Sequence, residues 1–333
     1  MDGTGTRTGF GAISGRLCGL NSAELGLIGV IAMLLVVMLL SPATRETFFS
    51  AYNLQSVARG AAITGILALG SLLVIVVRAI DLSVGSMLGL ASMTAAIMMS
   101  ADRFGLPVWM AVVVALAVGG LVGLYHGLLV VRIGINPLIA TLGSMIILRG
   151  VVNVMADSQV VRNLPAGFTG FGQGTIFGIP NIFIALLVCG FAVDILLRRT
   201  RLGRNMFAVG SNENVARLSG VRVGAVITFA FVACSVLSVV AGLLLTARMT
   251  SAVPTVGNGY ELQAIAAAVI GGASLMGARG TALGAILGAI LMSVIINVGV
   301  QLDVNAFVMQ IVTGALLTLA VIMDQLQRRK RNG

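Results

Sequence analysis

Long apolar runs alternate with short polar stretches along nearly the whole chain. A helix needs about 20 apolar residues to cross the hydrocarbon core of a bilayer, and this length predicts ten membrane-spanning helices. They are expected at residues 25–41, 54–77, 82–100, 108–131, 136–156, 181–197, 223–247, 263–277, 281–300 and 305–323. The eighth is short and rich in glycine, so we expect it to be broken or tilted. The predicted fold class is all-α: a polytopic membrane protein of about ten transmembrane helices, some of them short or broken.

Glycine spacing within these runs indicates close helix packing. Gly119, Gly123 and Gly127 recur every fourth residue in the fourth span, and Gly284 and Gly288 do so in the ninth. Glycines spaced by four lie on one helix face and let a neighbouring backbone approach closely. The sequence therefore predicts a compact bundle.

Composition supports a membrane protein and argues against other classes. Of the 333 residues, 58% are hydrophobic and 10% are charged, which leaves too little charge to cover a soluble domain of this size. The net charge of +10 does not indicate nucleic-acid binding, because the basic residues lie between the apolar runs and not on a face interleaved with aromatic residues. Cys18, Cys189 and Cys234 have no metal-ligand spacing, and no disulfide is expected.

The distribution of basic residues predicts the orientation. With ten spans and a cytoplasmic N-terminus, fifteen of the 21 basic residues face the cytoplasm and four face outward, as the positive-inside rule requires. The four outward residues are Arg45, Arg103, Arg162 and Arg248. The chain then divides into a cytoplasmic tail at 1–24, one transmembrane domain at 25–323 and a basic cytoplasmic tail at 324–333.

A polar segment at residues 198–222 interrupts the apolar pattern and carries six arginines and one acid, Glu213. Ser211 or Asn212 can cap a short helix, because either side chain can accept a hydrogen bond from a first-turn amide. Gly220 is suited to end it, so we expect about two helical turns over 213–219. From composition alone, this segment could also be a basic loop that only orients the protein.

Several kinds of reaction chemistry have no matching residues. The single lysine, Lys330, lies near the C-terminus, so a phosphate loop is excluded, and no GxSxG nucleophile is present. The lone His126 is expected to be a packing or interfacial residue. Asp194 is the one acid expected inside a span, four residues before Arg198, which is ion-pair spacing. Neither a catalytic residue nor a metal site is therefore predicted.

Three further local features are expected around the spans. Asp81, with Ser83, can cap the helix that follows, and Asn136-Pro137 suits the start of the fifth span. Arg59 and Arg149 lie near span ends and are expected to snorkel to water. The run 254–262 is expected to be an outer loop leading into the broken eighth span.

Four stretches, in consistent order between about residues 55 and 325, resemble one known family. They are AIDLSVGSMLGL (79–90), NPLIATLGSMIILRGV (136–151), LGRNMFAVGSNENVARLSGV (202–221) and ARMTSAVPTVGNGYELQAIAAAVIGGASLMGARGT (247–281). These resemble the sugar permeases of bacterial ATP-binding-cassette (ABC) importers, the ribose, arabinose and xylose group of the branched-chain amino acid/ribose permease superfamily.

The resemblance implies the fold of an ABC-importer permease and a set of partners. It implies an inner-membrane homodimer, an ATPase subunit with two nucleotide-binding domains that carry ATP and magnesium, and a periplasmic sugar-binding protein. No cofactor is expected in this chain. The implied cargo is a monosaccharide, ribose or another pentose first, with inositol, a hexose or autoinducer-2 as alternatives. A self-sufficient secondary carrier is the competing class, and the absence of acids expected at mid-membrane argues against it.

In this family the segment 198–222 corresponds to the cytoplasmic loop that docks on the ATPase. The residues that the resemblance assigns to coupling are Arg201, Gly203, Asn212, Glu213, Ala216, Arg217, Leu218 and Gly220. On the short helix, we expect Glu213 and Ala216 to face the ATPase and Leu218 to pack beneath the spans.

The opposite side would meet the sugar-binding protein. Candidate docking residues are Arg45, Arg162, Arg248, Tyr260 and Glu261. For Tyr260 and Glu261, capping of the eighth span is the alternative role.

Overall fold

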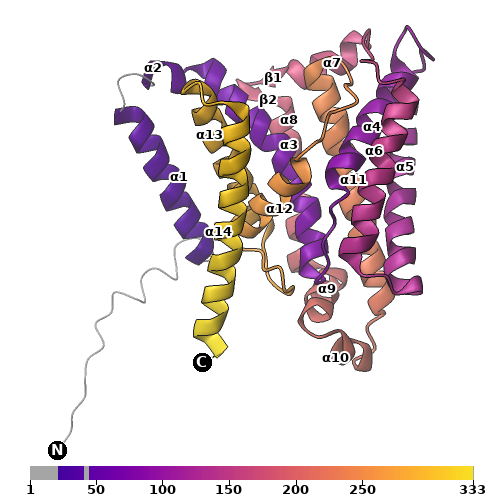
Figure 1. Cartoon of the computed structure of the whole chain (residues 1–333), viewed down its shortest axis with the longest axis vertical. Helices are drawn as coiled ribbons and strands as arrows, with labels where there is room; N and C mark the ends of the chain where they lie inside the picture. The colour runs from indigo at the N-terminus through magenta and orange to yellow at the C-terminus, as the bar shows by residue number, and fades with distance from the viewer. Residues whose placement is uncertain (1–21, 41–44, 333) are drawn as a thin grey trace, which may run out of the picture.

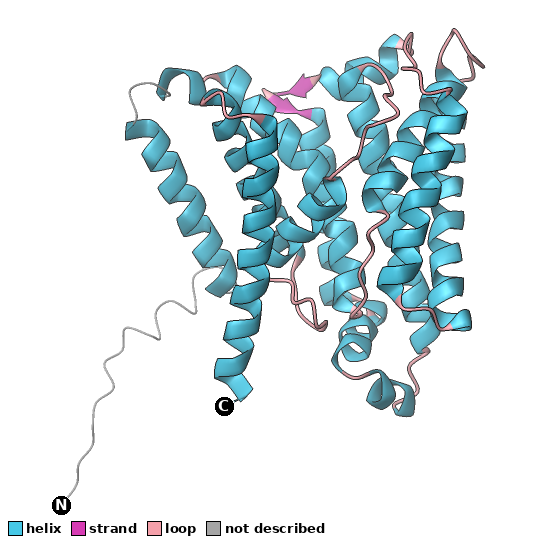
Figure 2. Cartoon of the chain, viewed as in Figure 1, coloured by secondary structure: helices cyan, strands magenta, loops and turns pink. Residues whose placement is uncertain are grey.

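The computed structural model describes residues 22–40 and 45–332 and shows a bundle of long helices with one small hairpin (Figures 1 and 2). Its elements are α1 (Ser22–Leu40), α2 (Arg45–Phe48), α3 (Ala51–Val76), α4 (Val84–Met99), α5 (Val108–Gly127), the π-helical continuation η1 (Leu128–Ile133), α6 (Pro137–Ala156), α7 (Ala166–Gln173), β1 (Thr175–Ile176), β2 (Ile179–Pro180), α8 (Asn181–Arg199), α9 (Arg201–Ser211), α10 (Glu213–Leu218), α11 (Val223–Met249), α12 (Tyr260–Ile270), α13 (Ala282–Gln301) and α14 (Ala306–Asn332). The strands pair antiparallel, with Ile176 opposite Ile179.

Each of the ten predicted spans overlaps a helix in the described part of the chain. Six helices there are long and apolar enough to cross a bilayer: α3, α5 with η1, α6, α8, α11 and α13. The apolar parts of α1, α4, α12 and α14 are shorter. The fold is therefore a helical membrane bundle with several spans, and the count of ten crossings stays a prediction.

One predicted boundary was wrong. The eighth span was placed at 263–277, but α12 covers Tyr260–Ile270 and residues 271–281 are not helical. This loop contains three glycines and Ala278 at positive φ, a backbone conformation that ends a helix. The predicted tail 324–333 is, as far as residue 332, a continuation of α14. Of the predicted tail 1–24, residues 1–21 lie outside the described residues.

The core is built around α3, whose residues from Ala61 to Val76 are all buried. Apolar side chains of α8, α11, α12 and α13 surround it. The glycine faces make the close contacts that their spacing predicted. At Gly123 of α5 a Cβ atom would lie 2.5 Å from the Cα of Val232 in α11, and at Gly288 of α13 it would collide with the carbonyl oxygen of Ala267 in α12.

Two non-helical stretches lie between helices of the bundle. Residues 77–83 separate α3 from α4, and residues 250–259 separate α11 from α12. Both α4 and α12 are shorter than the helices before them. The backbone hydrogen bonding of the helices is thus interrupted twice, each time before a short apolar helix. We call residues 77–83 the first break in this helical ladder and residues 250–259 the second break.

The helix termini gather at two ends of the bundle (Figure 1). The segments α9 and α10 lie at the same end as the start of α1 and the last turns of α14, whereas α2, α7 and the hairpin lie at the other. We call the first the basic end, because α9 and α10 carry three of the chain's arginines and Arg198 and Arg199 precede them. The loop after α12 also reaches it, since the amide of Ala278 donates to the carbonyl of Val76 at 2.9 Å.

The glycine contact of α5 generates a stability prediction. Gly123→Ala would force α5 away from α11, because the added Cβ would press on backbone atoms that cannot rotate aside, and overpacking of this kind costs about 1–3 kcal/mol. A lower thermal unfolding temperature in detergent is expected. Gly120→Ala is the matched control, because nothing lies within 4 Å of a Cβ there. Equal stability of the two variants would contradict the packing argument.

Candidate functional site

The basic end presents two short helices. The side chain of Thr200 caps α9 by accepting a hydrogen bond from the amide of Gly203 at 3.0 Å. The side chain of Asn212 caps α10 by accepting one from the amide of Val215 at 3.1 Å. Gly220 follows at φ +82° and turns the chain toward α11. The predicted short helix is therefore confirmed, with Asn212 as its cap, while Ser211 is the last residue of α9.

The helix α9 was not predicted. Its Leu202, Met206 and Val209 follow the i, i+4, i+7 spacing of an apolar helix face, which is the signal that was overlooked. At Gly210, a Cβ atom would collide with the carbonyl oxygen of Val76 and lie 2.8 Å from the amide nitrogen of Ala278. The end of α9 thus rests directly on the end of α3 and on the loop after α12.

The expected faces of α10 were wrong. Ala216 is 3% exposed and belongs to the hydrophobic core, whereas Leu218 is 89% exposed and Val215 is 57% exposed. Two residues of helix span about 200°, so burying Ala216 turns Leu218 outward. The turn at Gly220 fixes this orientation, because the amide of Val221 donates to the carbonyl of Ala216 at 3.0 Å.

The remaining assigned coupling residues divide between surface and packing positions. Glu213 and Arg217 are exposed and form an ion pair at 2.8 Å. Arg201 is also exposed, while Gly203 is buried against the backbone at the end of α8. Asp194 and Arg198 pair at 2.8 Å as predicted. The exposed face of α10 is therefore apolar at Val215 and Leu218, with a charged pair beside it.

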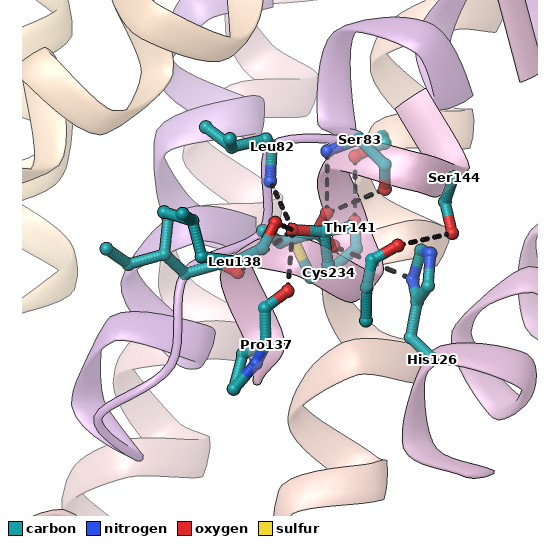
Figure 3. Close-up of polar contacts among 12 residues, drawn as sticks. Leu82, Ser83, His126, Pro137, Leu138, Thr141, Ser144 and Cys234 are labelled. Carbon is teal, nitrogen blue, oxygen red and sulfur yellow. Dashed lines mark hydrogen bonds and ion pairs between the residues drawn. The ribbon is translucent and has the colours of Figure 1, made fainter. Parts of the chain in front are cut away.

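A buried polar cluster holds the first break in the helical ladder (Figure 3). Asp81 accepts two hydrogen bonds at one carboxylate oxygen, from the amide of Ser83 at 2.8 Å and from the Ser83 hydroxyl at 2.6 Å. The hydroxyl of Thr141 in α6 accepts a hydrogen bond from the amide of Leu82 at 3.1 Å and donates one to the carbonyl of Pro137 at 2.9 Å. These side chains supply partners for backbone that no helix satisfies.

His126 faces this cluster from α5. Its side chain is fully buried, with Nδ1 at 4.0 Å from the second carboxylate oxygen of Asp81 and the ring beside that of Phe231. Within the described residues, neither ring nitrogen nor that carboxylate oxygen has a hydrogen-bond partner. The packing role expected for His126 agrees with this burial. Asp194 was the one acid expected inside a span; Asp81, in the break at 77–83, is nevertheless buried in the bundle at 2% exposure.

The second break is held by α4 and α6. Arg149 of α6 donates to the carbonyl of Val256 at 2.8 Å and lies 3.9 Å from the carboxylate of Glu261. Arg149 therefore points into the bundle, and the snorkelling predicted for it was wrong. A Cβ at Gly85 of α4 would collide with the carbonyl oxygen of Gly257 and with the Glu261 carboxylate. The run 254–262 is thus packed against α4 and is not a free outer loop.

The described side chains among the five candidate docking residues differ in exposure. Arg162 is exposed, and Arg248 and Tyr260 are half-buried; the side chain of Arg45, the first residue of α2, is not among those described. Glu261 accepts the amide of Gly259 at 3.2 Å, which agrees with the capping role. Docking of a binding protein on these residues stays a prediction. The described residues hold no group of three histidine, cysteine or acidic side chains able to bind a metal.

Comparisons with known proteins bear on these features together. The family model described as "Branched-chain amino acid transport system / permease component" matches residues 53–321. The chain is 35% identical to the ribose import permease protein RbsC of Haemophilus influenzae, covering 89% of this chain and 91% of that protein, and 36% identical to RbsC of Escherichia coli, covering 90% and 92%. It is 33% identical to the galactose/methyl galactoside import permease protein MglC of E. coli, covering 91% and 95%. No significant match was found among solved structures.

The Asp81 contacts generate a second prediction. Asp81→Leu removes the acceptor of two hydrogen bonds and leaves the buried amide and hydroxyl of Ser83 unsatisfied, at a cost of about 1–3 kcal/mol each. Asp81→Asn keeps an acceptor oxygen but removes the charge. We expect thermal unfolding in detergent to be lowered strongly by Asp81→Leu and little by Asp81→Asn. An equally large loss in both variants would show that the charge facing His126 is what matters.

Proposed function

This chain belongs to the family of permease components of branched-chain amino acid transport systems, and we propose that it is the membrane subunit of an ABC importer for a monosaccharide. The observation that carries the proposal is similarity over about nine tenths of the chain to proteins named as ribose import permeases. Ribose is the first candidate. Galactose and allose follow, because permeases named for these sugars are also similar.

ATP hydrolysis would belong to a separate subunit. A phosphate loop needs a lysine next to its glycines, and Lys330 near the C-terminus is the chain's one lysine. We therefore place ATP and magnesium on a partner with two nucleotide-binding domains. A second permease copy would complete the path, and a periplasmic binding protein would deliver the sugar.

The basic end is proposed to be cytoplasmic in the bacterial inner membrane, with both termini on that side. The excess of arginine at α9 and α10 supports this orientation. The binding protein would then meet the opposite end, where the exposed Arg162 lies beside the bridge between Val161 and Ala252.

The contacts of α9 suggest how movement of the ATPase reaches the spans. A partner that binds the exposed Val215 and Leu218 pushes on α10, whose Ala216 is anchored in the core. Because Gly210 touches both Val76 and Ala278, a shift of α9 acts at once on the end of α3 and on the loop after α12. The helix α3 precedes the break at 77–83, and α12 follows the break at 250–259.

Reconstituted transport tests the proposed function. Proteoliposomes that contain this chain with its ATPase should take up labelled ribose when ATP and the binding protein are supplied, and should not do so without ATP. Uptake of galactose or allose in place of ribose would correct the cargo. ATP-independent uptake by this chain alone would overturn the proposal in favour of a secondary carrier.

A docking prediction follows from the exposure of Leu218. Burying a leucine side chain contributes about 1.5–3 kcal/mol, so Leu218→Ser should weaken ATPase binding by at least about tenfold. Affinity of the purified permease for the ATPase is the measurement. Leu302→Ser is the matched control, since Leu302 is also exposed, at 56%, but follows α13 at the opposite end. Unchanged affinity in Leu218→Ser would exclude this apolar docking surface.

A further inference from the structure

The segment 253–262 runs deep into the bundle although it is not helical before Tyr260. It starts at the bridge between Val161 and Ala252 and descends between α11 and α12 (Figure 1). Its Gly257 touches Gly85 of α4. Gly85 lies 14 residues before Met99, the last residue of α4, which corresponds to about 21 Å along a helix. That depth is well inside a hydrocarbon core of about 30 Å.

Part of this segment faces outward at that depth. Thr255 and Asn258 are exposed, next to Gly257, which is buried against α4. Lipid offers no hydrogen bonds, so non-helical backbone and polar side chains within a membrane occur where protein covers them or where they border water. An exposed threonine and asparagine on non-helical backbone are therefore incompatible with a lipid-facing surface.

Charged groups next to the segment point to the same conclusion. The side chains of Arg149 and Glu261 are 19% and 15% exposed, so neither is sealed in the protein. Ionised side chains within a membrane face a bundle interior or a water-filled cavity. By contrast, α8 exposes Leu187, Val188 and Phe191, an apolar face suited to lipid.

The segment is fixed in place rather than loose. Close backbone contacts at Gly85 and Gly257, with Gly257 at φ +86°, leave no space for side chains between it and α4. The guanidinium of Arg149 also donates a hydrogen bond to the carbonyl of Val256. Thr255 and Asn258 therefore keep a defined position, as groups that contact a passing ligand must.

From these observations, and resting on the proposed function, we propose that Thr255 and Asn258 line the water-filled passage of the importer and hydrogen-bond the hydroxyl groups of a monosaccharide. Both side chains are neutral and can donate and accept, which suits an uncharged polyol that must enter and leave readily. Arg149 and Glu261 position the segment and are not assigned as ligand contacts. The alternative is that this face forms a water-free interface between two permease copies.

Thiol accessibility in the assembled importer tests the passage. Asn258→Cys is introduced into a full-length variant in which Cys18, Cys189 and Cys234 are replaced by serine, and a membrane-impermeant, water-soluble thiol reagent is applied from both sides. Reaction requires the thiolate and therefore water. Asn258→Cys should react, and saturating ribose with ATP should slow the reaction. Val188→Cys, on the apolar face of α8, should not react.

An unreactive Asn258→Cys in an importer that still transports sugar would overturn the passage and favour a water-free interface, with the proposed function intact. Failure of the unmodified importer to transport any sugar would instead overturn the proposed function.

Uptake kinetics give a second measurement of the same proposal. Each of Thr255→Val and Asn258→Leu removes hydrogen-bonding capacity worth about two- to tenfold in affinity. Uptake at low sugar concentration should fall by that factor, while ATPase binding stays unchanged. Val188→Leu is the control and should transport normally. Normal uptake in both variants would exclude these side chains as sugar contacts.

Discussion

Backbone hydrogen bonding in a medium without water is the constraint on which this structure depends. A continuous helix satisfies its own amides and carbonyls, but this chain breaks the ladder twice inside the bundle, at 77–83 and at 250–259. Side chains support each break. Asp81 and Thr141 hold the first, and Arg149 holds the second. Polar side chains thus lie at both breaks, where the backbone needs hydrogen-bond partners.

Close backbone contacts at glycine residues connect the two breaks to each other and to the basic end. Gly85 lets the second break lie directly on α4, the helix that follows the first break. Gly210 brings α9 against the carbonyl of Val76, where α3 ends, and against the loop that follows α12. Backbone in such contact has no side-chain layer to absorb a displacement. These contacts therefore form a continuous packed connection between the basic end and both breaks, which the proposed coupling requires.

The sequence predicted the features that depend on local composition. The positions of the apolar helices, the caps at Asn136 and Asn212 and the turn at Gly220 all follow from a few neighbouring residues. It did not predict the features that depend on distant partners. Whether Ala216 or Leu218 faces inward is decided by the turn that returns the chain to α11, and the direction of Arg149 is decided by Val256, 107 residues away.

The distinction between local composition and distant partners also corrects the argument that was based on the acidic residues. The expected absence of acids at mid-membrane served as an argument against a secondary carrier, yet Asp81 and Glu261 both lie within the bundle. Each accepts a backbone amide at the end of a break and has a basic side chain within 4.0 Å. A carboxylate with these contacts has a structural reason to be buried, so its presence does not indicate ion coupling. Thr255 and Asn258, the residues proposed to line the passage, are uncharged and can donate and accept, which is the chemistry that the proposed neutral sugar requires.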